Sequence, residues 1–186
     1  MTSMLVALGA NIPGPAGPPA DTIAAAIQAI GNRGVSVHSM ARLYVSDAVP
    51  AGSGPAFVNT CVAVENAASP RSFLDMLHGI EAELGRRRIR RWAPRTLDLD
   101  LIAAGDLVLP DPPTQTRWRM LSPDAQARDA PDGPVLPHPR MQDRAFVLKP
   151  LADIAPDWRH PLLGLSVADM LSALPQADRD AVRPMA

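Results

Sequence analysis

Two aspartates, Asp98 and Asp100, alternate with leucines in the stretch RTLDLDLI, which begins at Arg95. Strict alternation is typical of a β-strand, in which every second side chain lies on the same face. The leucines are then expected to enter the core, and the two carboxylates share the other face. At about 7 Å apart, they can bind one or two divalent cations between them. Taken alone, a charged outer face that protects a sheet edge is the more common explanation.

Positive charge directly precedes these carboxylates, with six arginines between Arg86 and Arg95. Guanidinium groups suit phosphate, to which they donate paired hydrogen bonds. Mg²⁺ in turn prefers one or two carboxylates together with phosphate oxygens and water. The combination therefore predicts a Mg-nucleotide site. Lys149 is the only lysine and lies far from any glycine-rich loop, so a Walker-type phosphate loop is absent.

A second candidate group lies in the predicted strand FVNTCVAVE, where Phe57 and Asn59 share one face and the valines share the other. With the valines inward, an aromatic ring and an amide stand side by side. This pair suits a flat heteroaromatic ligand that stacks on the ring and bonds to the amide. Judged locally, an ordinary aromatic residue covered by a loop is the more common explanation.

The composition of the chain favours one globular domain, residues 1–186, with a proper core. The hydrophobic share is 47% and the net charge is -1, less basic than expected for a protein that coats a polyanion. The single cysteine, Cys61, excludes an internal disulfide and a cysteine zinc cluster. No apolar run reaches the length of a membrane span, and the start does not resemble a signal peptide. We predict a cytoplasmic protein with no nucleic-acid or membrane partner, as either a monomer or a homodimer.

The periodicity predicts an α+β fold whose elements alternate in a recognisable order. The expected elements are a strand at 4–8, a helix at 21–32, strands at 35–45 and 57–65, a helix at 69–84 and a strand at 96–102. Asp21 or Thr22 is expected to cap the first helix, which ends at Gly31 and Asn32. This order is the ferredoxin-like βαββαβ core.

Residues 105–137 are rich in Pro, Asp, Arg and Gln and show weak periodicity. A connection of this length predicts an irregular insert or a lid within the domain, with a short helix possible near 123–128. A last small helix is expected at 166–174.

The stretch RWAPRTLDLDL closely resembles the signature of the 6-hydroxymethyl-7,8-dihydropterin pyrophosphokinase family, which is RWGPRTLDLDL. Four other stretches extend the resemblance over most of residues 1–158: LGANIPG, FVNTCVAVE, LHGIEAELGR and LPHPRMQDRAFVLKPLADIAP. The resemblance implies an antiparallel sheet flanked by helices in three layers, α/β/α. It also implies transfer of diphosphate from ATP to the hydroxymethyl group of the pterin, with AMP as the second product.

The resemblance also implies roles for individual residues. Asp98 and Asp100 would bind two Mg²⁺ ions. ATP would be bound by Glu81, Arg86, Arg88, Arg91, Trp92, Arg95, His138 and Arg144. The catalytic residues would be Arg86, Arg91, Arg95, Asp98 and Asp100. The pterin would be bound by Ser46, Val49, Phe57, Asn59 and Phe146.

The sequence departs from the family pattern at Ala93, where the signature has Gly, in SDAVPAG, and in the length of 105–137. These departures concern loop closure and substrate affinity more than the reaction. Two rival functions stay open. A ferredoxin-like nucleic-acid-binding module would need two or three aromatic residues on adjacent central strands and a basic surface, whereas this chain has only seven aromatic residues in all and a pI of about 6.4. An ATP-dependent acyl or phosphoryl ligase would differ in its second substrate.

Overall fold

The computed structural model describes residues 1–48, 52, 54–86, 95–122, 125 and 128–185. The elements are β1 (Thr2–Ala10), α1 (Pro19–Asn32), β2 (Ser36–Met40), β3 (Tyr44–Ser46), β4 (Phe57–Asn66), α2 (Pro70–Glu83), β5 (Asp98–Ala104), α3 (Pro112–Arg119), the 3-10 turn η1 (Met141–Asp143), α5 (Ala145–Ile154), α6 (Val167–Ala173), α7 (Gln176–Asp180) and β6 (Arg183–Pro184). The strands form one antiparallel sheet in the order β5-β1-β4-β3-β6, and β2 also pairs with β4. The predicted α+β fold class is confirmed.

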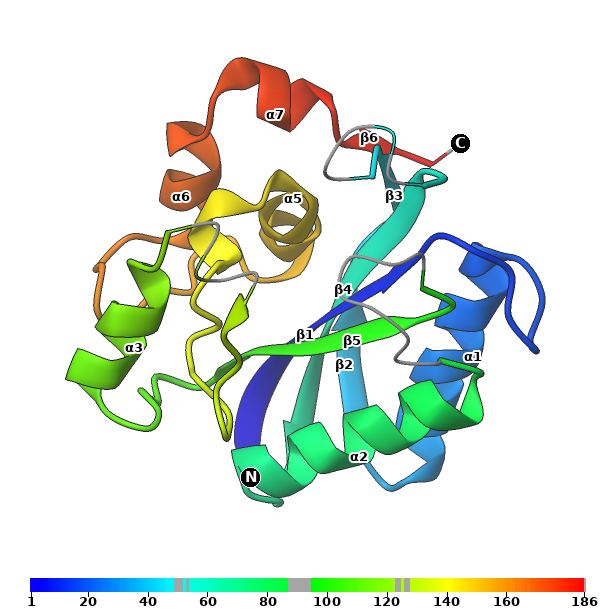
Figure 1. The fold of residues 1–186 in the computed structure, drawn as a ribbon. Coiled ribbons are helices and arrows are strands. Elements are labelled where there is room, and N and C mark those ends of the chain that lie inside the picture. The colour runs from blue at the N-terminus through cyan, green and yellow to red at the C-terminus, as the bar shows by residue number, and fades with distance from the viewer. Residues whose placement is uncertain (49–51, 53, 87–94, 123–124, 126–127, 186) are drawn as a thin grey trace.

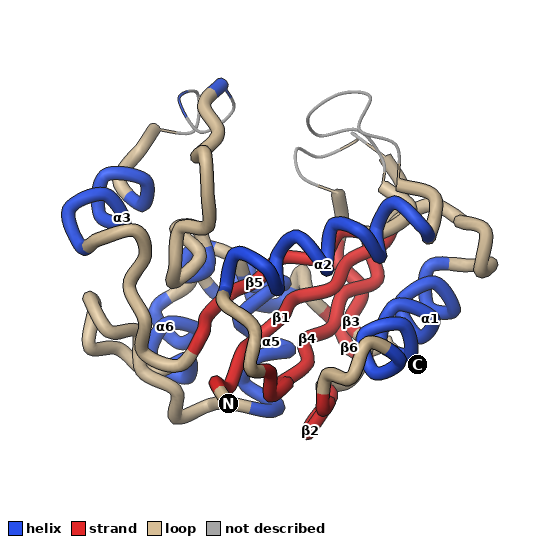
Figure 2. Tube along the Cα trace, turned by 90° about the horizontal axis from the view of Figure 1, so that it is seen from below, coloured by secondary structure: helices blue, strands red, loops and turns tan. Residues whose placement is uncertain are grey.

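The sheet lies between two layers of helices (Figures 1 and 2), with α1 and α2 on one face and α5 and α6 on the other. β1 shows why its sequence is almost wholly apolar. Met4, Val6 and Leu8 enter the core under α1 and α2, whereas Leu5 enters the core under α5 and α6. Both faces are buried, so the strand carries little polar surface. The three-layer α/β/α arrangement is therefore confirmed.

The predicted continuous strand at 35–45 is wrong, because the chain divides here into β2 and β3. The pairing of β2 with β4 shifts register between Val37 and Ser39. A register shift of this kind moves the following side chains to the opposite face. As a result Tyr44, rather than Val45, is buried, with 2% of its surface exposed.

The predicted start of the first helix is also wrong, whereas its predicted end at Asn32 is confirmed. α1 begins at Pro19, and Pro18 takes the N-cap position. Asp21 and Thr22 do not cap the helix, because both lie within its first turn. The buried hydroxyl of Thr22 instead donates a hydrogen bond to the carbonyl of Gly17, which precedes the helix. Proline suits the first helical position, since its fixed φ is already helical. At the other end, Gly34 adopts the positive φ of +78° that terminates the turn.

The predicted ends of α2 are confirmed. Ser69 caps the helix by accepting a hydrogen bond from the backbone N–H of Ser72, and Pro70 occupies the first turn. Gly85 follows the helix with a φ of +87°. The chain after α2 thus places Arg86 beside Asp98, the first residue of β5.

Five elements were not expected: α3, η1, α5, α7 and β6. α3 begins within the predicted insert, where Asp111 accepts a hydrogen bond from the backbone N–H of Thr114. The helix expected near 123–128 lies mostly outside the described residues. The helix expected at 166–174 is present as α6, but it is not the last, because α7 and β6 follow it.

Within the described ranges, no helix is both long and apolar enough to cross a bilayer.

Candidate active site

The sheet face toward α5 changes character along three neighbouring strands. On each strand an apolar side chain lies under α5 and α6, and small, polar or aromatic residues follow toward one edge of the helical layer. The pairs of groups are Ile102 with Asp100 and Asp98 on β5, Leu5 with Ala7 and Gly9 on β1, and Cys61 with Asn59 and Phe57 on β4. The second group lines a cavity of about 890 Å³. This volume falls within the range of small-molecule sites.

Gly9 lies at the centre of this face. In the antiparallel pairing it stands opposite Asp98 on one side and opposite Asn59 on the other. A Cβ atom at Gly9 would lie 3.3 Å from Oδ1 of Asn59 and 3.7 Å from Cδ1 of Phe57. Glycine therefore leaves an open trough between the carboxylate strand and the aromatic strand, and any larger residue would narrow it.

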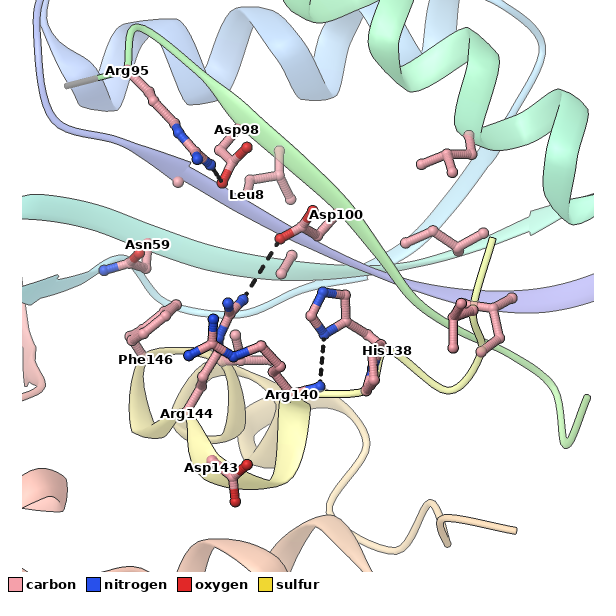
Figure 3. Close-up of a pocket in the computed structure, with 18 of the residues that line it drawn as sticks. Leu8, Asn59, Arg95, Asp98, Asp100, His138, Arg140, Asp143, Arg144 and Phe146 are labelled. Atoms are coloured by element: carbon pink, nitrogen blue, oxygen red, sulfur yellow. Dashed lines mark hydrogen bonds and ion pairs between the residues drawn. The ribbon is translucent and has the colours of Figure 1, made fainter. Parts of the chain in front are cut away.

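The acidic end of the trough is held by arginines. Oδ1 of Asp98 lies 2.6 Å from Nη1 of Arg86, and its Oδ2 accepts a hydrogen bond from Arg95 (Figure 3). Asp100 lies farther along β5, where its Oδ2 is 3.9 Å from Nη1 of Arg144. The side chain of Asp100 is 38% exposed, compared with 22% for Asp98. Asp100 is thus the more accessible of the two carboxylates.

Glu81 lies behind this cluster rather than in the cavity wall. It is 1% exposed, and its Oε1 accepts hydrogen bonds from the backbone N–H of Leu99 and from Arg86. Burial raises the pKa of Glu81 to about 7, although Arg86 opposes the shift. Burial disfavours the charge of Arg86, but Asp98 and Glu81 outweigh it and raise the pKa of this guanidinium. Glu81 therefore orients Arg86 and anchors β5.

His138 lies across the cavity from Asp100 (Figure 3). Burial and the nearby charges of Arg144 and Arg140 lower its pKa to about 3. Nδ1 accepts a hydrogen bond of 3.2 Å from the backbone N–H of Arg140. In a neutral ring with Nδ1 as acceptor, the hydrogen belongs on Nε2. His138 can therefore donate one hydrogen bond to an anion without being protonated.

The other end of the trough is aromatic. Phe57 from β4 and Phe146 from α5 both line the cavity, and the guanidinium of Arg144 lies 5.6 Å from the Phe146 ring centre. Asn59 is 6% exposed and donates a hydrogen bond of 3.0 Å to the hydroxyl of Ser46. This bond fixes the amide plane, so that Oδ1 points toward Gly9. The pair can stack on a flat ring and bond to its edge.

The structure brings nearly all the described site residues into one place. Those that line the cavity are Ser46, Phe57, Asn59, Arg95, Asp98, Asp100, His138, Arg144 and Phe146. Glu81 and Arg86 lie directly behind Asp98. The predictions for Val49, Arg88, Arg91 and Trp92 fall outside the described residues.

Two residues of the site, Asn11 and Arg140, were not predicted from the sequence. Asn11 is 4% exposed, accepts a hydrogen bond of 2.7 Å from the backbone N–H of Arg95, and donates one to the carbonyl of Pro55. It thereby joins the start of the β5 segment to the segment before β4. A polar residue directly after an apolar strand, as in LGAN, was the available signal. Arg140 also lines the cavity, and nothing in PHPR distinguishes it from a surface arginine.

Comparison with known proteins places this geometry in a family. Residues 5–156 match the family model described as 7,8-dihydro-6-hydroxymethylpterin-pyrophosphokinase (HPPK). A 2-amino-4-hydroxy-6-hydroxymethyldihydropteridine pyrophosphokinase of Synechocystis is 38% identical over 183 residues, covering 98% of this chain and 80% of that protein. The enzyme of the same name from Pseudomonas aeruginosa is 37% identical, covering 91% of this chain and 90% of that one.

Solved structures share the fold at low sequence identity. The wild-type Plasmodium falciparum HPPK-DHPS with pteroate superposes with a TM-score of 0.63 at 12% identity. The match covers 92% of this chain and 44% of that longer chain. This chain therefore spans less than half of the HPPK-DHPS chain.

Proposed function

Because the chain belongs to the 7,8-dihydro-6-hydroxymethylpterin-pyrophosphokinase family, it is a pyrophosphokinase of folate biosynthesis, and we propose how its residues perform that reaction. The substrates are ATP and 6-hydroxymethyl-7,8-dihydropterin. The observation that carries the proposal is one cavity with carboxylates and arginines at one end and an amide between two phenylalanines at the other. The nucleic-acid-binding alternative is not supported. Nucleic-acid-binding modules of this fold bind bases on an open face of the sheet, whereas helices pack on both faces of this sheet.

The row Asp98–Gly9–Asn59 sets the scale of the site. Asp98 and Asn59 are separated by two interstrand spacings, about 10 Å. A pterin ring that stacks between Phe57 and Phe146 and bonds to Asn59 would place its hydroxymethyl arm over Gly9. The arm would then face phosphates held at the carboxylate end. Gly9 is proposed to leave room for the reacting atoms.

The residues present fit Mg²⁺ bound together with ATP. Among the described residues, no group of three or more His, Cys, Asp or Glu side chains could hold a metal ion alone. Mg²⁺ does not need such a group, since one or two carboxylates, phosphate oxygens and water suffice. We propose that Asp98 and Asp100 hold two ions. When bound, the ions neutralise phosphate charge and brace the triphosphate.

The transfer itself is proposed to be an in-line displacement. The hydroxymethyl oxygen forms a bond to the β-phosphorus and loses its proton to water, as the bond from that phosphorus to the α,β-bridging oxygen breaks and AMP is released. Arg95 and Arg144 are placed to offset the charge that moves toward the departing oxygen, and Nε2–H of His138 can donate to a phosphate. Arg86 would also bind phosphate once its ion pair with Asp98 is broken. Such a site acts by positioning and charge compensation and needs no covalent nucleophile.

The remaining predicted residues keep their proposed roles: Arg88, Arg91 and Trp92 toward ATP, and Val49 toward the pterin. We propose that the insert at 105–137 belongs to the same single domain and walls the nucleotide side. Two contacts support this. Asp129 and residues 131–136 line the cavity, and Nη1 of Arg71 on α2 donates a hydrogen bond of 2.9 Å to the carbonyl of Asp132.

The products test this function. Protein, Mg-ATP and 6-hydroxymethyl-7,8-dihydropterin should give equal amounts of AMP and pterin diphosphate. An ATP-dependent ligase would show no turnover with this pterin and would need a different second substrate.

A further inference from the structure

The C-terminal segment, residues 175–185, lies beside the aromatic end of the cavity. It contains α7 and β6, which pass over α5 and the end of β3 (Figure 1). Asp178, Ala181 and Val182 line the same cavity as Phe57 and Phe146. The match to the family model ends at residue 156, so this segment lies outside the matched range.

Backbone pairing joins the C-terminal segment to β3. Tyr44 pairs with Pro184 and Val45 pairs with Arg183. The N–H of Met185 donates a further hydrogen bond of 2.8 Å to the carbonyl of Leu43. β3 also carries Ser46, which holds the amide of Asn59. The C-terminal segment thus supports the strand from which the pterin-binding amide is oriented.

Packing joins the C-terminal segment to Phe146 as well. Val182 is 3% exposed and forms a small apolar cluster with Tyr44 and Ala145. Phe146 and Leu174 pack against this cluster. Phe146 is only partly buried, so one part of its surface rests on this cluster while another part faces the cavity. The position of Val182 therefore affects the position of the Phe146 ring.

Lys149 on α5 fixes the C-terminal segment at the cluster. Its ammonium donates hydrogen bonds to the carbonyls of Arg179 and Val182, where α7 ends and β6 begins. A cation is favourable at a helix C-terminus, because it offsets the partial negative charge of the last carbonyls. Lys149 is the only lysine in a chain otherwise supplied with arginine, and the compact ammonium reaches two carbonyls at once.

We propose that the C-terminal segment, fixed by Lys149, is a wall of the pterin half of the cavity and that Lys149 is a positioning residue for pterin binding. Lys149 acts through Val182 on Phe146 and through β6 on β3 and Asn59. Lys149 itself is not among the described residues that line the cavity. The inference rests on the proposed function, since it identifies the aromatic end as the pterin end.

The test compares the binding of the two substrates to Lys149→Met, which keeps the length of the stem and removes the charge. Calorimetry should be done with 6-hydroxymethyl-7,8-dihydropterin at saturating Mg²⁺ and nonhydrolysable ATP analogue, and separately with the analogue alone. The pterin Kd should rise about tenfold, because Lys149→Met removes both hydrogen bonds that fix the segment and each is worth at least that factor. The Kd of the analogue should stay unchanged, and Lys149→Arg should restore part of the pterin affinity.

Arg33→Met is the control, because Arg33 also donates to a backbone carbonyl at a helix end, that of Ala29, and pairs with Glu83, but does not line the cavity. It should leave both affinities unchanged. If Lys149→Met binds pterin as tightly as wild type, or loses both ligands equally, the inference is overturned. Failure of the wild-type protein to bind this pterin would instead overturn the proposed function.

Hydrogen exchange on the wild-type protein gives a second test that does not depend on the folding of a variant. With analogue and Mg²⁺ present, addition of pterin should slow exchange of the N–H groups of Ala181, Val182 and Met185. These groups donate to the carbonyls of Ala177, Arg179 and Leu43. Unchanged exchange throughout residues 176–185 would contradict the inference.

Discussion

Arg86 and Asp98 form an ion pair, with 2.6 Å between Nη1 and Oδ1, and Arg95 holds the second oxygen of the same carboxylate. Both oxygens that would coordinate Mg²⁺ are therefore bonded to guanidinium groups. Binding of Mg-ATP then requires an exchange in which the carboxylate takes the metal and the arginines take phosphate. In such an exchange every charged group keeps a partner of opposite charge. Arg86 and Arg95 also already lie beside the proposed phosphate position.

The first prediction concerns the carboxylates. Asp98→Asn and Asp100→Asn should each lower kcat by several orders of magnitude, a loss on the order of 3 to 5 kcal/mol of transition-state stabilisation. Asp98→Asn should also lower the free energy of unfolding, since it leaves the largely buried Arg86 with one charged partner fewer. Single-turnover rates at saturating Mg²⁺ and urea denaturation measure the two effects. Wild-type rates in either variant would contradict the assignment.

The second prediction concerns the aromatic pair. Phe57→Ala or Phe146→Ala should weaken pterin binding by about 1 to 3 kcal/mol through lost stacking and burial. The affinity for an ATP analogue should change less than the pterin affinity, because among the described residues the carboxylates and Arg95 do not contact either ring; Phe146 reaches this end only through Arg144. Calorimetry with each ligand measures the difference. Equal losses for both ligands would show a general defect in folding instead.

The third prediction concerns the open trough. Gly9→Val should weaken pterin binding by on the order of 2 kcal/mol, because the added side chain crowds Oδ1 of Asn59 and the Phe57 ring. Gly79→Ala is the control, since a Cβ there meets nothing within 4 Å and the residue lies on the exposed side of α2. It should slightly raise the free energy of unfolding and leave pterin binding unchanged. Tight pterin binding by Gly9→Val would mean that the ring does not lie over β1.

The order of the elements, the two aspartates with their arginines, and the pair Phe57 and Asn59 followed from local patterns, whereas the rest of the site followed from the family resemblance. The alternation in TLDLDLI predicts a strand whose leucines are buried in the core on one face. Asp98 and Asp100 must then lie on the opposite face. Ser69 and Pro70 mark the start of α2 by the same local chemistry. Predictions of this kind need no knowledge of distant contacts.

Features that depend on tertiary contacts were missed. The shift between Val37 and Ser39 appears only where β2 pairs with β4. Asn11 and Lys149 act on backbone groups more than 25 residues away, and no local pattern identifies those partners. The family resemblance implies that Glu81 binds ATP, but in the structure its side chain is buried behind Arg86. Which polar residue faces a ligand and which one supports it depends on the packed structure.

The fourth prediction concerns His160, whose side chain is fully buried. Burial, followed by the charge of Arg119, lowers its pKa from 6.5 to about 4. Below pH 6.5 the unfolded chain gains a proton at His160 that the folded protein does not. The free energy of unfolding should therefore fall as the pH drops from about 6.5 to about 4, by on the order of 3 kcal/mol from this residue.

His160→Asn isolates that contribution, because an amide oxygen can still accept from the N–H groups of Leu162 and Leu163, as Nδ1 does. Urea denaturation of both proteins at several pH values measures the difference. The variant should show a shallower loss of stability across this window. Parallel pH profiles for the two proteins would contradict the prediction.

The nucleotide product shows which phosphorus of ATP the hydroxymethyl oxygen attacks. Folded protein, Mg-ATP and 6-hydroxymethyl-7,8-dihydropterin are incubated together, and the nucleotides are separated by chromatography. Attack on the β-phosphorus predicts AMP in equal amount to a diphosphorylated pterin, with no AMP when the pterin is omitted. ADP as the product, or no pterin-dependent turnover by the folded protein, would contradict the account.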